Sequence, residues 1–206
     1  QDMSMEVIKT MANYKNICNY IHLPVQSGSN KILKAMNRQH SREDYFKLIA
    51  NVKKYIPDCA ISHDLICGFP TETEQDHKET ISLMQSVKYS FGYMFKYSER
   101  PGTLAARKLK DNVNDKIKKR RLQEVVDLQQ KHSLERTKEF IGKTTEVLIE
   151  KESKKSNKEW SGRNPQNTTV VFPKENYNIG DFVNVKIREC TSATLKGKAI
   201  GYSKNN

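Results

Sequence analysis

Three short polar segments, each following an apolar run, restrict the fold of this chain more than any other feature. The runs and the segments that follow them are Tyr20–Val25 with Gln26–Ser29, Ala60–Cys67 with Gly68–Thr73, and Phe91–Phe95 with Tyr97–Gly102. In β/α barrels the site is built from loops at the C-terminal ends of the strands, and these segments are typical of one side of such a barrel mouth. Three strands cannot close a barrel, so the sequence predicts an incomplete one.

Helical patterns separate the three runs. Ser41 and Asp44 form a capping-box pattern at the start of one helix, and Pro57 ends it. Thr73 begins the next helix, with Asp76 in its first turn. Strands and helices that alternate in this way predict right-handed βαβ units and a parallel sheet.

The pattern changes in the second half of the chain. Residues 114–140 predict one long helix capped by Asn114, and a linker precedes it. After Gly142 come short runs of β-branched and apolar residues, Thr145–Ile149, Thr168–Phe172, Phe182–Ile187 and Ala193–Ile200. About 60 residues of this kind predict a small five-stranded barrel of the OB type. We therefore expect two domains, an α/β domain with the long helix over 1–140 and a β-barrel over 141–206.

Charge is distributed unevenly along the chain. The net charge is +12, and most of it lies after residue 95. A basic half is typical of a polyanion partner, and it is equally typical of a solvated lysine-rich surface. The first turns of the long helix carry Lys116 and Lys118–Arg121, where cations oppose the helix dipole. Bound phosphate is one explanation for that crowding.

Cysteine spacing argues against a metal site in this chain. Cys18, Cys59, Cys67 and Cys190 form neither a CxxC pair nor a CxxxCxxC run, so we expect no cluster or zinc ligand here. We expect Cys18 and Cys67 to be small buried thiols. Scattered cysteines favour a reducing cytoplasm, and no apolar run approaches the ~20 residues that would span a bilayer. The sequence predicts a cytoplasmic protein with no membrane partner.

Several blocks of this chain resemble, in order and spacing, the motifs of the radical-SAM methylthiotransferases and of the TRAM domain that those enzymes carry. The blocks are His22–Asn30 with Met36–Arg38, Asp64–Glu74, Tyr93–Thr103, and, in the expected barrel, Gly162–Asn164 and Val171–Pro173. The resemblance covers essentially the whole chain. It implies the C-terminal part of a radical-SAM, TIM-like barrel followed by a TRAM barrel. Two positions depart from the family pattern, because His63 replaces a small hydroxyl residue and Thr71 replaces a glycine.

The tRNA branch of that family implies a definite reaction. A reduced [4Fe–4S] cluster cleaves S-adenosylmethionine, the resulting radical removes hydrogen from C2 of N6-isopentenyladenosine next to the anticodon, and a methylthio group is inserted there. The implied cofactors are S-adenosylmethionine and two [4Fe–4S] clusters, whose cysteine ligands are expected outside this chain. We therefore expect the chain alone to be inactive and to contain no catalytic residue. The implied partners are the tRNA anticodon stem-loop and an electron donor for the cluster.

The resemblance also implies roles for individual residues. Gln26 and Ser27 are expected to contact the aminoacyl or ribose part of S-adenosylmethionine, although an ordinary turn would also place them there. Ser62, Asp64 and Glu72 are further candidates for cofactor contact, with an internal hydrogen bond or a helix N-terminus as the alternative in each case. The expected RNA contacts are Arg100, Lys119, Arg120, Arg163, Asn164, Lys186 and Lys196.

Other functions are compatible with parts of this pattern. One sister branch modifies a ribosomal protein, another modifies threonylcarbamoyladenosine, and a non-enzymatic RNA-binding protein is a third alternative. Ser27, where the ribosomal-protein branch tends to carry His, and the segment Tyr97–Gly102 favour the tRNA branch. The threonylcarbamoyladenosine branch stays open.

Overall fold

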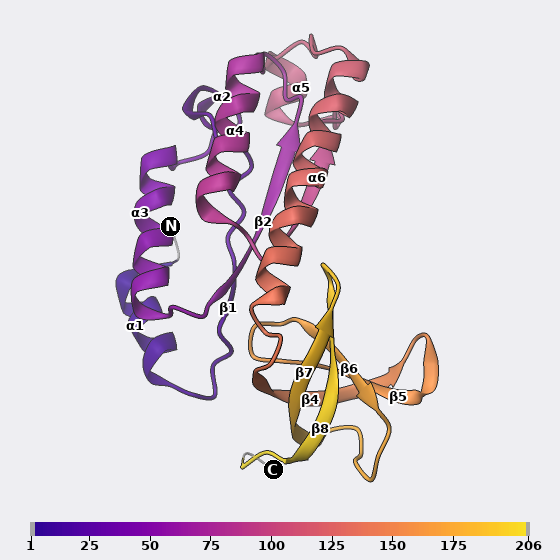
Figure 1. Ribbon diagram of the computed structural model, residues 1–206. Coiled ribbons are helices and arrows are strands. Elements are labelled where there is room, and N and C mark those ends of the chain that lie inside the picture. Colours follow the sequence, from indigo (N-terminus) through magenta and orange to yellow (C-terminus); the bar gives the residue numbers. More distant parts are fainter. Residues whose placement is uncertain (1–2, 205–206) are drawn as a thin grey trace.

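The computed structural model describes residues 3–204, so residues 1–2 of the first expected domain and residues 205–206 of the second lie outside it. Figure 1 shows an α/β part and a β-barrel connected by one long helix. In chain order the elements are α1 (Met5–Asn13), β1 (Tyr20–His22), α2 (Asn30–Ala35), α3 (Arg42–Tyr55), β2 (Ala60–Cys67), α4 (Glu74–Val87), β3 (Phe91–Lys96), α5 (Leu104–Lys108), α6 (Asp115–Lys138), β4 (Thr144–Ser153), β5 (Ser156–Arg163), β6 (Thr169–Pro173), β7 (Phe182–Cys190) and β8 (Thr194–Tyr202).

The first three strands form a parallel sheet in the order β1-β2-β3, as the sequence predicts. β1 is shorter than the expected run Tyr20–Val25 and ends at His22. Leu23 N–H still donates to the Ser62 carbonyl at 2.9 Å, and the next hydrogen bond to β2 runs from Gln26 N–H to the Asp64 carbonyl. The pairing resumes at Gln26, which forms a parallel bridge with Leu65.

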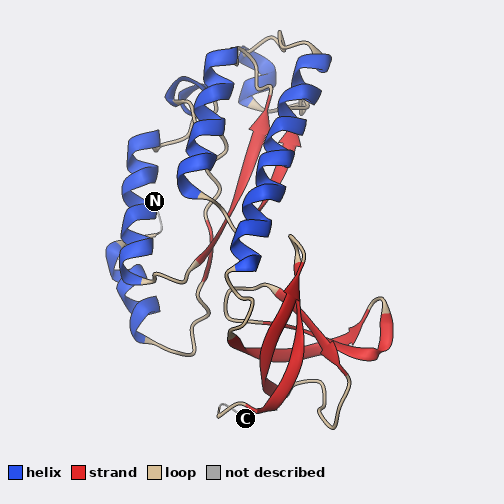
Figure 2. Cartoon of the chain, in the orientation of Figure 1, coloured by secondary structure: helices blue, strands red, loops and turns tan. Residues whose placement is uncertain are grey.

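Helices cover one face of this sheet, as Figure 2 shows. Their apolar stripes and the strands form one core, with Ile21, Ile61 and Leu65 from the strands and Val52 and Leu83 from the helices. The expected capping box is present at the start of α3, and the structure adds a second one between Thr73 and Asp76 at the start of α4. These two helices therefore begin where the sequence predicts. The face of the sheet that points away from the helices carries the side chains that are not part of this core.

The C-terminal part is a closed five-stranded barrel with the strand order β4-β5-β6-β8-β7. Its core includes Val147, Trp160, Phe172, Val185 and Leu195. The sequence predicts five strands, but only four of them are marked by a run of β-branched residues. β5 (SNKEWSGR) contains no β-branched residue, so its strand propensity is low and its pairing with β4 and β6 determines its conformation.

α6 joins the two parts. It ends at Lys138, two residues before the expected end, and the short helix α5 lies in what the sequence predicts to be a linker. At its C-terminal end Thr137 Oγ1 donates a hydrogen bond to the Thr191 carbonyl at 2.7 Å, which fixes the barrel to the helix. A cavity of about 700 Å³ lies between the sheet, the end of α6 and the barrel. Within residues 3–204, no helix has the length and apolar character needed to cross a membrane.

Candidate functional site

The segments that follow the three parallel strands lie at one edge of the sheet. Gln26 N–H donates to the Asp64 carbonyl at 2.9 Å, and Tyr97 N–H donates to the Cys67 carbonyl at 2.8 Å. The rings of Phe69 and Tyr97 meet edge to face with 5.0 Å between their centroids. The structure thus brings together the three segments that the sequence places at one barrel mouth.

A polar and aromatic strip runs along the sheet face that points away from the helices. Asp64 lies opposite Tyr93 in the parallel ladder, and the side chains of Tyr93 and Phe95 are half-exposed. The side chain of Asp64 is partly exposed, and its Oδ1 lies 3.5 Å from His22 Nε2. A partly exposed carboxylate on this face is able to accept hydrogen bonds from a ligand.

Ser62 is buried on the same face. Its Oγ lies 2.8 Å from the hydroxyl of Tyr20 and 2.8 Å from His22 Nδ1, so it links two side chains of β1. Through these contacts His22 connects Ser62 with Asp64. Nothing in the local sequence indicates this contact, because 40 or more residues separate His22 from its partners.

Gln26 and Ser27 are both buried, and they shape the turn after β1. Gln26 adopts a left-handed backbone with φ of 70°. Ser27 Oγ accepts a hydrogen bond from Ser29 N–H and lies 3.4 Å from Thr80 Oγ1 of α4. A Cβ on Gly28 would lie 2.5 Å from Thr80 Cα, so this glycine permits close packing of the turn on α4.

Glu72 is buried within the loop Gly68–Thr73, which we call the β2–α4 loop. Its Oε1 accepts hydrogen bonds from Gly68 N–H at 3.1 Å and from Arg121 Nη1 at 2.8 Å. Burial raises the pKa of Glu72, and the Gly68 amide and the Arg121 guanidinium oppose that rise. The carboxylate therefore ties the two ends of the loop together and to α6.

Four of the five cations in the first turns of α6, Lys118–Arg121, pair with carboxylates of this chain, which gives their crowding an explanation beside bound phosphate. Lys118 pairs with Asp111, and Lys119 pairs with Asp115 at 3.0 Å. Arg120 binds Glu74 and Glu124 through its two terminal nitrogens, and Arg121 binds Glu72 and Glu74. Lys118 and Arg121 are buried, whereas Lys119 and Arg120 are exposed.

The remaining expected RNA contacts divide between loops and the barrel. Arg100 is exposed in the segment after β3. Arg163 donates to the Asn167 carbonyl at 2.8 Å, and Asn164 is buried with its Oδ1 accepting from Thr168 N–H at 2.8 Å. Both residues thus shape the β5–β6 loop.

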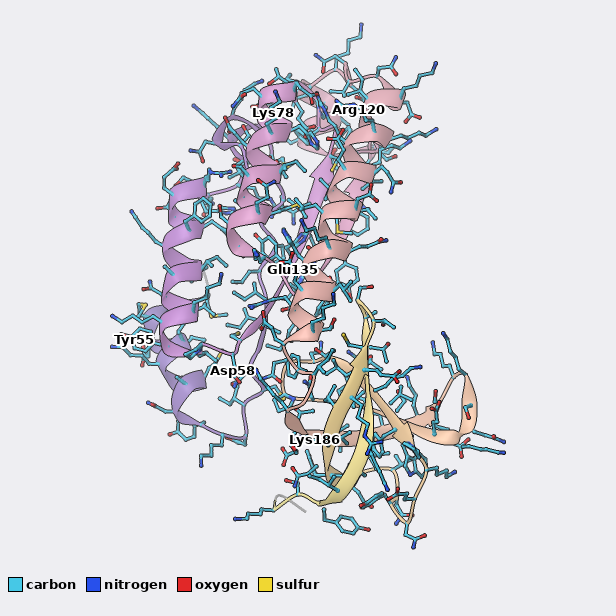
Figure 3. All side chains as sticks on the ribbon, in the orientation of Figure 1. Tyr55, Asp58, Lys78, Arg120, Glu135 and Lys186 are labelled. Carbon is cyan, nitrogen blue, oxygen red and sulfur yellow. The ribbon has the colours of Figure 1, made fainter. Side chains whose placement is uncertain are left out.

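Lys186 and Lys196 are exposed on the outside of β7 and β8, and Lys186 lies directly opposite Lys198. Figure 3 shows Arg120 and Lys186 at opposite ends of the molecule. The structure therefore separates the expected RNA contacts into two groups, one near the polar edge of the sheet and one on the barrel.

The cysteines of this chain do not fit an iron–sulfur cluster. Cys59 and Cys67 are buried, and burial raises the pKa of both thiols to about 12. Cys18 is exposed, contrary to the expectation that it is buried. Among the described residues, no three His, Cys, Asp or Glu side chains are placed to hold a metal ion together.

Comparisons with known proteins agree with the geometry of the sheet and the barrel. A family model described as Radical SAM superfamily matches residues 2–84, and the TRAM domain model matches residues 138–200. A protein of Christiangramia forsetii named tRNA-2-methylthio-N(6)-dimethylallyladenosine synthase is 70% identical over all 206 residues. This chain belongs to the radical-SAM methylthiotransferase family. A protein of the same name from Flavobacterium psychrophilum is a further relative within the family, at 66% identity over all 206 residues.

The methylthiotransferase relatives are longer than this chain, which spans 43% of the length of each of these two. Among solved structures, the coproporphyrinogen III oxidase of Escherichia coli, a radical SAM enzyme, matches with a TM-score of 0.54. That match covers 98% of this chain and 50% of the oxidase, at 14% sequence identity. It shows a shared fold and nothing about substrate.

Proposed function

We propose that this chain is part of a tRNA methylthiotransferase that inserts a methylthio group at C2 of N6-isopentenyladenosine next to the anticodon. The observation that carries the proposal is the 70% identity to a relative of that name, which extends through both the sheet and the barrel. We propose 1–140 and 141–206 as the domain bounds. The reducing environment that the free cysteines favour supports a cytoplasmic location.

We propose that S-adenosylmethionine binds at the edge of the sheet where the segments after β1, β2 and β3 meet, which we call the polar edge. Asp64 supports this because its partly exposed carboxylate can accept hydrogen bonds from ammonium or ribose hydroxyl groups. Gln26 borders the same edge, and Ser27, Ser62 and Glu72 hold the neighbouring backbone and side chains in place. When bound to a reduced cluster, S-adenosylmethionine supplies the radical, and the residues of this chain orient it and shield it from water.

We propose that the barrel holds the RNA backbone. Lys186 and Lys196 support this because they are exposed on adjacent strands, and OB-like barrels bind nucleic acid with such a face. Arg100 and Lys119 are exposed near the polar edge, where they would meet the RNA close to the reacting adenosine. Arg120 bridges two carboxylates, and Arg163 and Asn164 hold the backbone of the β5–β6 loop, so we assign the main role of these three residues to the internal structure.

The proposal is tested with the complete, cluster-loaded gene product, reduced by an electron donor. We expect it to convert N6-isopentenyladenosine in an anticodon stem-loop to the 2-methylthio form, as detected by mass spectrometry. Asp64→Asn should raise the apparent Kd for S-adenosylmethionine, whereas Asp127→Asn, at an exposed position on α6, should not change it. The proposal would be contradicted if the protein modified threonylcarbamoyladenosine or a ribosomal protein instead. It would also be contradicted if the protein bound RNA without consuming S-adenosylmethionine.

The chain alone should be inactive, because its described residues supply no set of cluster ligands. Residues 1–206 expressed by themselves and supplied with iron, sulfide and S-adenosylmethionine should produce no 5′-deoxyadenosine. Formation of 5′-deoxyadenosine by this segment would contradict that expectation.

A further inference from the structure

The β2–α4 loop is bound on one side by the N-terminal half of α6 and by the residues just before this helix. Asn112 Oδ1 accepts a hydrogen bond from Thr71 N–H at 2.8 Å. Arg121 Nη1 donates to the Glu72 carbonyl at 3.1 Å as well as to the Glu72 carboxylate. The loop is thus held through its backbone as well as through its side chains.

The packing at Gly68 leaves little freedom to the loop. Gly68 has a φ of 75°, and a Cβ at this position would lie 2.3 Å from Lys118 Cγ. The Lys118 stem therefore lies directly on the loop backbone, with its ammonium 5.1 Å from the centroid of the Tyr97 ring. α6 reaches the segments after both β2 and β3 through this one side chain.

Arg121 is the residue on which these contacts converge. It is only 4% exposed, and its two terminal nitrogens reach the Glu72 carbonyl, the Glu72 carboxylate and the Glu74 carboxylate. A planar fork can make these contacts at the same time, whereas a lysine ammonium cannot reproduce them. Its burial makes direct contact with RNA phosphate impossible in this conformation.

We propose that Arg121 is a positioning residue, which holds the backbone of the β2–α4 loop at the edge where S-adenosylmethionine binds. The inference rests on the proposed function and deepens it, because it assigns to Arg121 and Glu72 together the placement of the loop beside the cofactor. Arg121 holds the Glu72 carboxylate, and that carboxylate accepts a hydrogen bond from Gly68 N–H, so Arg121 also fixes Gly68. The exposed neighbour Arg120 binds only carboxylates, so it provides a matched control.

The test compares three variants with the complete, cluster-loaded wild-type protein. Arg121→Met removes the fork and leaves Glu72 buried without its cation, so both Tm and cofactor affinity should fall. We expect the Kd for S-adenosylmethionine to rise about tenfold or more, because a displaced loop misplaces its contacts. Arg120→Met should leave that Kd within about twofold. The double variant Arg121→Met with Glu72→Gln removes the unpaired charge, so Tm should recover while cofactor affinity stays low.

Two further measurements separate positioning from folding. In protein without cofactor, amide hydrogen exchange over Gly68–Thr73 should be faster in Arg121→Met and in the double variant than in the wild type or Arg120→Met. The Kd for an anticodon stem-loop should stay within about twofold in all variants, because RNA is assigned to other residues.

The outcomes are distinct. Recovery of cofactor affinity together with Tm in the double variant would overturn the inference, because it would make Arg121 a stabilising residue only. Unchanged cofactor binding in Arg121→Met would also overturn it and leave the proposed function intact. A wild-type protein that binds RNA but no S-adenosylmethionine would overturn the proposed function itself.

Discussion

The carboxylate of Asp58 accepts a hydrogen bond from the side-chain amide of Gln166, with 2.8 Å between Oδ2 and Nε2. Asp58 precedes β2, and Gln166 lies in the β5–β6 loop of the barrel, 108 positions along the chain. Asn19 donates to both oxygens of the same carboxylate, at 2.9 and 3.0 Å. Figure 3 shows Asp58 at the end of the α/β part nearest the barrel. One carboxylate therefore links the sheet to the barrel.

Asp58→Ala should weaken the contact between the sheet and the barrel. Gln166 and Asn19 lose their acceptor, so we expect a loss of about 1 kcal/mol in the free energy of unfolding. Amide exchange in the β5–β6 loop should also become faster. Asp58→Asn keeps one acceptor oxygen and should cost less. Equal urea midpoints for the wild type and both variants would show that the contact contributes nothing.

Thr71→Gly should stabilise the protein. Thr71 has a φ of 72°, a conformation that strains a β-branched residue and that glycine adopts freely. Relief of that strain should raise the free energy of unfolding by about 1 kcal/mol, reduced by the greater flexibility of glycine in the unfolded chain. Thr71→Ala, which lacks the branch but keeps a Cβ, serves as the control and should gain less. A lower Tm for Thr71→Gly would show that the Thr side chain itself stabilises the loop.

Gly92→Ala should be destabilising because of His63. A Cβ on Gly92 would lie 2.3 Å from His63 Nε2, too close for either group to remain in place. We expect a cost of about 1–3 kcal/mol in urea unfolding. In a His63→Ser background the same substitution should cost much less, although His63→Ser alone leaves a cavity. Additive effects in this double-mutant cycle would rule out the steric coupling.

His63 should make stability depend on pH. Burial lowers its pKa from 6.5 to about 4, because a charged ring is disfavoured between Tyr89 and α6. Between these values the unfolded chain binds a proton that the folded protein does not, so stability is full above pH 6.5 and declines towards pH 4. The loss from this group should reach about 3 kcal/mol. The difference in unfolding free energy between wild type and His63→Gln should therefore vary over this range, and a constant difference would contradict the assignment.

Lys186→Gln should affect stability and RNA affinity in opposite directions. Lys186 faces Lys198 across β7 and β8, and like charges in that position repel, so the variant should gain a few tenths of a kcal/mol in stability. If Lys186 contacts phosphate, affinity should fall, and the slope of log K against log salt should shrink by about 0.7–0.9. Lys131→Gln, at an exposed position on α6, should leave that slope unchanged. An unaltered slope in Lys186→Gln would remove Lys186 from the RNA surface.

Local patterns in the sequence predict most of the fold. The capping-box pattern at Ser41 marks the start of α3, Thr73 marks the start of α4, and the run Ala60–Cys67 gives the bounds of β2. The prediction fails where conformation depends on partners far along the chain. β5 is one example, since polar residues form a strand there because β4 and β6 pair with it on both sides.

The candidate site is less predictable than the fold. The meeting of three loops follows from the parallel order of the strands, and the sequence therefore indicates it. The partners of individual charges do not follow in this way, because 49 positions separate Arg121 from Glu72 and 42 separate His22 from Asp64. Four consecutive cations on one helix look like a surface for an external anion until their carboxylate partners are brought next to them by folding.

α6 fixes the rotation of the barrel as well as its distance from the β2–α4 loop. Its first turns hold the β2–α4 loop, and Thr137 in its last turn is bonded to the barrel. Each residue of a helix adds a turn of about 100° and a rise of about 1.5 Å. Deletion of one residue midway along α6 would therefore rotate the basic face of the barrel by about a quarter of a turn around the helix axis. Deletion of seven residues, close to two full turns, would nearly preserve the orientation of that face and bring the barrel about 10 Å closer to the loop.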